Sequence, residues 1–224
     1  MSEGDNSMDL TGAGKLANAI PKEGWKKLID TACTTFSDLV APITKTTAGL
    51  GGLIQAKFDT MIDAQKVFAA DALYNAKDKV DRSGKTITGI PKSKVLLPSI
   101  ENASLESDDG LRDIWSNLIA NEMLDGSVHP EFPLVLSRLS SNDASVLSEI
   151  AANNSKITVQ SAAKALTVSL SIMGISFSQL LEEPADFSRE HLERLNLIQK
   201  GNGKWMLTYF GEEFVKAVTD PNFE

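Results

Sequence analysis

Cysteine and histidine are scarce in this chain and basic charge is in deficit, and each of these features excludes or disfavours a class of function. Cys33 is the one cysteine among 224 residues, so an internal disulfide and a thiolate cluster that binds metal are both excluded. Only two histidines are present, His129 and His191, and neither belongs to a metal-ligand spacing such as H-E-x-x-H. A Gly-x-Ser-x-Gly nucleophile elbow is also missing. We therefore expect a non-enzymatic protein with no catalytic residue, no metal site and no cofactor.

A basic excess is missing from every part of the chain, and the acidic charge lies mainly in the middle. Residues 1–89 hold 11 Lys and Arg against 11 Asp and Glu, residues 90–151 hold 4 against 10, and residues 152–224 hold 7 against 9. Nucleic-acid binding draws much of its affinity from Lys and Arg side chains that neutralise phosphates. The charge therefore disfavours DNA as a partner, although a small local basic patch stays open.

Residues 39–54 are apolar and small, but this run is shorter than the roughly 20 residues that a transmembrane helix needs. Pro42 and Lys45 interrupt it further. Its end holds the candidate hinge or membrane residues, Gly49, Leu50, Gly51, Gly52 and Leu53. We interpret the run as a Gly-rich turn between helices, with membrane contact as the alternative.

The first nine residues lack the basic start and apolar core of a secretory signal, and together with the lone cysteine this predicts a cytoplasmic protein.

Apolar residues in the N-terminal third recur every three or four positions, which is the spacing of a helix. One apolar stripe runs from Trp25 to Val40, and a second runs from Ile54 to Val80, long enough for one helix of about seven turns. These stripes predict an antiparallel helical hairpin over residues 16–82, preceded by a disordered tail over residues 1–15.

The middle of the chain, residues 83–151, predicts a small module of short helices. Pro91 and Pro98 predict extended or turn backbone before each proline. Residues 111–124 follow as an amphipathic helix, with N-cap candidates between Ser104 and Asp109. Its apolar face is expected to hold Leu111, Ile114, Trp115, Leu118, Ile119 and Met123, and its polar face Arg112, Asp113, Ser116, Asn117, Asn121 and Glu122. A second short helix is expected after His129 and Pro130, and a third after a capping pattern from Ser140 to Asp143.

Residues 152–224 predict a winged-helix-like module. We expect a helix over residues 159–173, a helix over residues 185–198 capped by Ser188, a β-ribbon around Gly201–Gly203 and a closing helix over residues 211–218. Candidate contacts with nucleic acid or a protein partner are Arg189, Arg194, Lys200 and Lys204. Glu190 and Glu193 cancel the charge of the two arginines, so a protein-binding or purely structural wing is favoured over one that reads DNA.

The order of motifs in the middle of the chain resembles the bacterial abortive-infection alpha (Abi-alpha) family. The resemblance is carried by Ile90-Pro91, Leu97-Pro98, the run from Leu111 to Asn121 with Trp115 and Leu118, then Val128-His129-Pro130-Glu131-Phe132, and Leu139-Ser140 to Asp143-Ala144. It is good over residues 90–150 and weaker outside them. The resemblance implies a role in defence against phage, within a multi-component system, and it implies no catalytic residue.

These observations predict a mainly α-helical protein that acts in phage defence through protein–protein interaction, with a protein partner or a second copy of itself. The Gly-rich joint suggests that the hairpin rearranges when a partner binds, and a cross-link between its helices that left protection unchanged would rule this out. Two alternatives come from other classes: a winged-helix regulator that binds DNA, and an effector that perturbs the membrane through residues 39–54.

Overall fold

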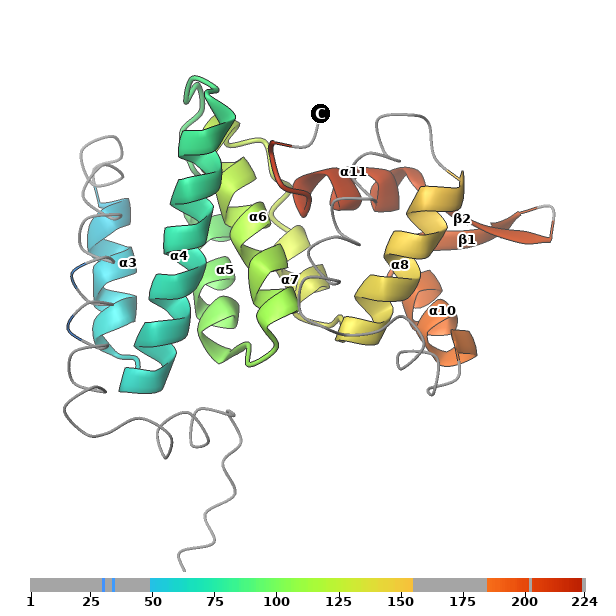
Figure 1. Cartoon of the computed structure of the whole chain (residues 1–224), viewed down its shortest axis with the longest axis horizontal. Coiled ribbons are helices and arrows are strands. Elements are labelled where there is room, and N and C mark those ends of the chain that lie inside the picture. Colours follow the sequence, from blue (N-terminus) through green and yellow to red (C-terminus); the bar gives the residue numbers. More distant parts are fainter. Residues whose placement is uncertain (1–29, 31–33, 35–48, 155–184, 202, 223–224) are drawn as a thin grey trace, which may run out of the picture.

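The computed structural model describes residues 30, 34, 49–154, 185–201 and 203–222, and these residues are mainly helical (Figure 1). The described elements are α3 Leu50–Asp59, α4 Asp63–Ser83, α5 Ser93–Leu105, α6 Asp109–Asp125, α7 Phe132–Leu136, α8 Ser141–Asn154, α10 Ala185–Arg194, β1 Ile198–Gly201, β2 Lys204–Leu207 and α11 Tyr209–Ala217. The predicted mainly α class with one small C-terminal ribbon is confirmed. The tail, the first arm of the hairpin and the helix predicted over residues 159–173 lie outside the described residues, apart from Asp30 and Thr34, which are helical.

The second arm of the predicted hairpin is two helices rather than one. Residues 60–62 separate α3 from α4, and the N–H groups of Thr60 and Met61 close the first helix by donating to the carbonyls three residues back, at 3.2 and 3.0 Å. The second helix starts where the backbone N–H of Ile62 donates to the side-chain oxygen of Gln65 at 3.1 Å. Apolar periodicity continues across this break, and for that reason the sequence predicted a single helix.

Pro98 lies inside α5, where the sequence predicted extended or turn backbone. A proline in a helix removes one backbone hydrogen bond and costs about 3 kcal/mol. Val95, Leu96 and Ile100 of the same helix are buried, and burying a side chain of this size stabilises the fold by roughly 1.5–3 kcal/mol. Three such side chains outweigh the cost of the proline, so tertiary packing keeps this segment helical.

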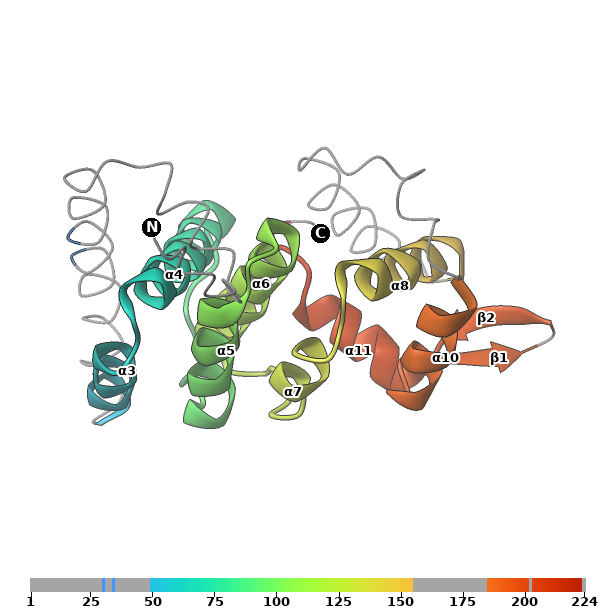
Figure 2. The ribbon, with the colours of Figure 1, turned by 90° about the horizontal axis from the view of Figure 1, so that it is seen from below.

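The helix α6 lies at the centre of the molecule and separates two hydrophobic cores. Leu111, Trp115 and Leu118 pack into a first core, which α7, α8, α10, the ribbon and α11 share with a few residues of α4 and α5. Ile119 and Leu124 pack into a second core shared with α3, α4 and α5. Figures 1 and 2 both show α6 between the N-terminal helices and the C-terminal elements.

Backbone contacts at the C-terminal end of α6 bring the segment after α4 close to it. The Thr88 N–H donates to the Leu124 carbonyl at 2.8 Å. Gly89 passes so near that a Cβ there would lie 1.8 Å from the Asp125 carbonyl oxygen, so any larger residue would displace the chain. Gly126, with a positive φ of 66°, then ends the helix in a conformation that favours glycine.

The C-terminal elements follow the predicted order of helix, ribbon and helix. Strands β1 and β2 pair antiparallel, with Ile198 opposite Leu207 and Gly201 opposite Lys204. The helix α10 and strand β2 both pack on α8, and α11 packs on α6 and β2. One continuous core therefore joins residues on both sides of the predicted boundary at 151 and 152, while the boundary itself stays a prediction.

We expect Leu118→Ala to destabilise the fold by about 2–5 kcal/mol, because Leu118 is fully buried and its removal leaves a cavity. Urea denaturation followed by circular dichroism measures the free energy of unfolding. Leu134→Ala is the matched control, since 52% of Leu134 is exposed and little apolar contact is lost there. Equal losses in the two variants would contradict this account of the core.

Candidate functional site

The motif residues that suggested a family are mostly core residues. Phe132 packs edge-on against Phe214 and Phe210 of α11, with ring centroids 5.5 and 5.4 Å apart. His129 is exposed, and its Nδ1 accepts from the Glu131 N–H at 3.2 Å, which shapes the turn before α7. Exposed Pro130 lies in the same turn. These residues hold α7 and α11 in place and form no reactive cluster.

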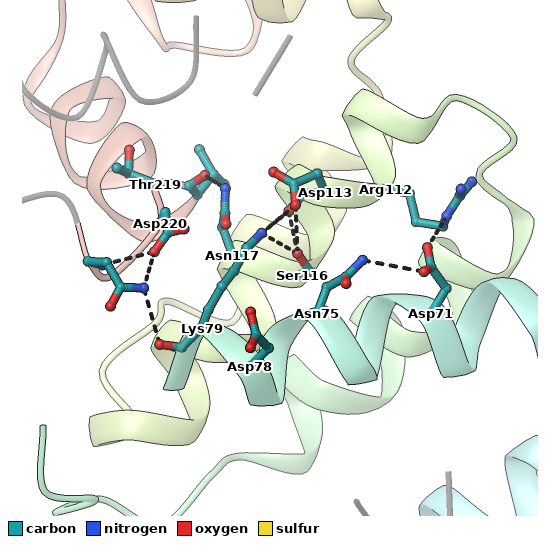
Figure 3. Close-up of polar contacts among 12 residues, drawn as sticks. Asp71, Asn75, Asp78, Lys79, Arg112, Asp113, Ser116, Asn117, Thr219 and Asp220 are labelled. Atoms are coloured by element: carbon teal, nitrogen blue, oxygen red, sulfur yellow. Dashed lines mark hydrogen bonds and ion pairs between the residues drawn. The ribbon is translucent and has the colours of Figure 1, made fainter. Parts of the chain in front are cut away.

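The polar face of α6, which the sequence separated from the apolar face, is largely buried. Ser116, Asn117 and Glu122 are each no more than 1% exposed. The reason is that α4 covers one part of this face and α11 covers another (Figure 3). Small hydroxyl and amide side chains on a predicted polar face, where Lys and Glu are usual, are the signal that could have indicated this burial.

Lys79 of α4 forms the central polar contact with α6. Its Nζ donates to the Asp113 carboxylate, to the Ser116 hydroxyl at 2.6 Å and to the Asp113 carbonyl at 3.3 Å (Figure 3). The Lys79 side chain is only 6% exposed, while that of Asp113 is 26% exposed. The three donors of the ammonium group are thus matched by three oxygens on α6.

Arg112 forms a second contact between α6 and α4. Its Nε donates to the Asp71 carboxylate at 2.8 Å, and its guanidinium lies 4.7 Å from the centroid of the Phe68 ring. It also pairs with Asp109 on its own helix. Burial lowers the pKa of Arg112, but hydrogen bonds and charge attraction from Asp71 and Asp109 raise it further, so the net pKa lies above its usual value.

Two amides of α6 bind the end of α11. Asn117 donates to the Val218 carbonyl at 3.0 Å, and Asn121 donates to the Ala217 and Thr219 carbonyls at 2.9 and 2.8 Å. The last carbonyls of a helix have no partner within the helix, so these amides satisfy them. The C-terminal helix is therefore held on α6 by hydrogen bonds as well as by apolar packing.

The contact between α8 and α10 depends on Asp143. The Asp143 carboxylate accepts from the Ser140 N–H at 2.9 Å and from the Ser140 hydroxyl at 2.8 Å, as the capping pattern predicted. It also lies 3.1 Å from Nδ1 of His191 on α10.

Ser188 was predicted to cap α10, but it is buried within that helix. Its hydroxyl accepts a hydrogen bond from the Asn142 side chain at 2.9 Å. The predicted cap was wrong because Ser188 instead faces α8.

The environment of Asp143 lowers its pKa. Burial of the carboxyl raises the pKa, but hydrogen bonds from Ser140, Ser188 and His191 together lower it more, so the net value lies below the usual one. These hydrogen bonds favour the ionised carboxylate over the neutral acid. The contact between α8 and α10 is consequently tied to the charge of one buried group.

The four predicted contact residues lie on α10 and the ribbon. Arg194 pairs with Glu190 at 2.6 Å, and both side chains are more than half exposed. Lys200 of β1 lies 5.7 Å from the ring centroid of Trp205, and Lys204 is exposed on β2. Arg189 is half-buried and faces a cavity that it shares with Lys204 and Trp205. The structure therefore brings together Arg189 and Lys204 at one cavity.

The predicted hinge residues lie at the start of α3. Gly49 has a positive φ of 99° and precedes the helix, whereas Gly51 and Gly52 lie inside it. Leu50 is buried in the second core, and Leu53 is 54% exposed. Residues 39–48 of the run interpreted as a Gly-rich turn lie outside the described residues, and residues 50–54 are helical. Within the ranges that the structure describes, no helix has both the length and the apolar character to cross a membrane.

The described residues thus form a mainly helical protein that ends in a helix, ribbon and helix packed on its core. Among these residues, no group of three or more His, Cys, Asp or Glu side chains could hold a metal ion.

The family model described as abortive infection alpha matches residues 69–218, and the chain belongs to this family. Membership implies a role in abortive infection, a form of defence against phage. No curated protein and no solved structure matches the chain. The match extends beyond residues 90–150, where the resemblance was good, and includes the C-terminal ribbon.

We expect Lys79→Met to destabilise the fold by about 3–5 kcal/mol, because it leaves Asp113 and Ser116 without their buried cationic partner. Lys77→Met is the matched control, since Lys77 is two positions away and 44% exposed. Chemical denaturation measures both losses. The double variant Lys79→Met, Asp113→Leu should recover part of the stability, and a double variant as unstable as the sum of both single changes would argue against a coupled pair.

Asp143 should make the fold sensitive to acid. Its folded-state pKa is lowered, so its contribution to stability is present above the unfolded pKa of about 3.9 and is lost as the pH falls through the folded value. We expect Asp143→Asn to be less stable than the natural chain at pH 7, with the difference shrinking below about pH 4. Denaturation midpoints between pH 7 and pH 2 measure this, and a constant difference across that range would contradict it.

Proposed function

We propose that this chain acts in abortive infection without catalysis, by binding a protein partner through the unit formed by α8, α10, the ribbon and α11. The observation that carries the proposal is a pair of exposed aromatic side chains on this unit. Phe187 of α10 is 62% exposed and Tyr209 of α11 is 79% exposed. Aromatic residues are enriched at protein interfaces, where they often contribute most of the binding energy.

The charges of the same unit support a protein partner over DNA. Glu190 pairs with Arg194, and Glu193 is exposed on the same helix, so α10 offers no net positive charge to phosphates. The order of helix, ribbon and helix favours the alternative of a DNA-binding regulator, which would use Arg189, Arg194, Lys200 and Lys204. DNA binding would fall steeply as salt rises, so its salt dependence distinguishes the two.

We treat a membrane-perturbing effector as the weaker alternative. Leu50 and Gly51 at the start of α3 are buried against the second core, so contact with a lipid bilayer would require these residues to leave it. A second copy of the chain remains within the proposal as one kind of protein partner. The proposed site of action is the cytoplasm of the infected cell.

The test is a plaque assay in a bacterial host that carries the chain at its natural level, with membrane potential recorded after infection. We expect Phe187→Ser and Tyr209→Ser each to lose protection while the variants stay folded, because an exposed anchor is removed from the interface. Tyr74→Ser is the matched control, since Tyr74 is 58% exposed on α4. Full protection by both variants would refute the proposal, and early depolarisation in the natural chain would favour the membrane effector.

A further inference from the structure

A cavity of about 430 Å³ opens between α8, α10 and β2. Its lining residues are Val146, Glu149, Ile150, Asn153, Arg189, Lys204 and Trp205. The three elements pack on one another, so the cavity is built by the fold and not by a single loop. A volume of this size lies within the range of about 300–1,000 Å³ that is usual for ligand sites.

The lining combines an apolar floor with charges of both signs. Val146 and Ile150 are buried on α8, and the half-exposed ring of Trp205 adds a flat wall. Arg189 and Lys204 bring positive charge from α10 and β2. An arginine has five N–H donors in a planar fork that matches a carboxylate, so it can serve more than one acceptor at once.

Glu149 and Asn153 decide which anionic ligand fits best. Glu149 places one carboxylate inside the cavity beside the two cations, so the cavity favours a ligand with few negative charges over a polyphosphate chain that carries several. A peptide carries backbone N–H groups that can donate to Glu149 and carbonyls that can accept from Asn153. The apolar floor and the Trp205 wall suit an aromatic or branched side chain beside the peptide's own carboxylate.

We propose that this cavity binds a segment of the protein partner in which an aromatic or branched apolar side chain lies next to an acidic residue. The apolar side chain packs against Val146, Ile150 and Trp205, and the carboxylate binds Arg189 and Lys204. This inference rests on the proposed function. It specifies the kind of partner segment that binds, which the exposed aromatic residues alone do not identify.

The direct test uses the full chain labelled with ¹⁵N and three short peptides as probes. The first peptide has the sequence Gly-Asp-Phe-Asp-Gly, the second replaces Phe by Ala, and the third replaces both Asp by Lys, with all ends blocked. The chain has three tryptophans, so its indole N–H signals are few, and Trp205→Phe assigns the one at the cavity. We expect the first peptide to shift the Trp205 signal in a saturable way, and the other two to bind at least tenfold more weakly.

Charge variants give the matched comparison. Arg189→Glu should weaken the first peptide at least tenfold, whereas Arg194→Glu, with the same change of charge five positions along α10, should change its affinity less than twofold. Lys204→Glu is the second variant and should also weaken the first peptide at least tenfold, and because Lys204 is exposed on β2 we expect this variant to stay folded. An unmoved Trp205 signal, equal binding of the lysine peptide, or equal effects of the two arginine variants would each overturn the inference.

Failure of this inference can be told apart from failure of the proposed function. If the peptide does not bind but Phe187→Ser and Tyr209→Ser still lose protection, the cavity is not the contact and the proposed function stands. If the Phe187, Tyr209, Arg189 and Lys204 variants all keep full protection, both the inference and the proposed function are refuted. If the first peptide binds as expected and Arg189→Glu and Lys204→Glu also lose protection, the cavity is the place where the partner is recognised.

Discussion

The burial of α6 is the constraint on which the rest of the structure depends. This helix separates two hydrophobic cores, so its apolar residues face both sides, and Ser116, Asn117 and Glu122 of its polar face have almost no exposed surface. A buried polar group without a partner costs about 1–3 kcal/mol, and an unpaired charge costs more. Lys79 therefore meets Asp113 and Ser116, and Asn117 and Asn121 meet the end of α11. These contacts set the positions of α4 and α11, and α11 packs in turn on the ribbon beside the cavity.

Local patterns in the sequence predicted the helices and the ribbon well where the structure of a segment depends mainly on residues within that segment. The helix over residues 111–124, the capping pattern from Ser140 to Asp143 and the ribbon around residues 201–203 are all confirmed. The prediction for Pro98 was wrong, and the burial of the polar face of α6 was not foreseen, because both depend on neighbours that are distant in the chain. A local rule for proline or for amphipathicity contains no information about what packs against the segment.

The candidate site could be predicted only in part for the same reason. Arg189 and Lys204 were predicted as contact residues, but the sequence placed them in one group with Arg194 and Lys200 and treated all four alike. The structure separates them, because α10 turns Arg189 toward α8 while Arg194 stays in solvent beside Glu190. The contribution of Val146, Ile150 and Glu149 to the same cavity depends on how α8 meets β2, which no local pattern contains.

The amides that bind α11 also affect how the chain is made. Asn117 and its carbonyl partner on Val218 are 101 positions apart, so α6 leaves the ribosome well before that partner exists. At synthesis rates of about 5–20 residues per second, the delay is roughly 5–20 s. During this time the face of α6 that packs against α11 stays exposed, and the first core is incomplete. The uncovered face of α6 in the nascent chain is thus accessible to chaperones and proteases until residues 209–219 emerge from the ribosome.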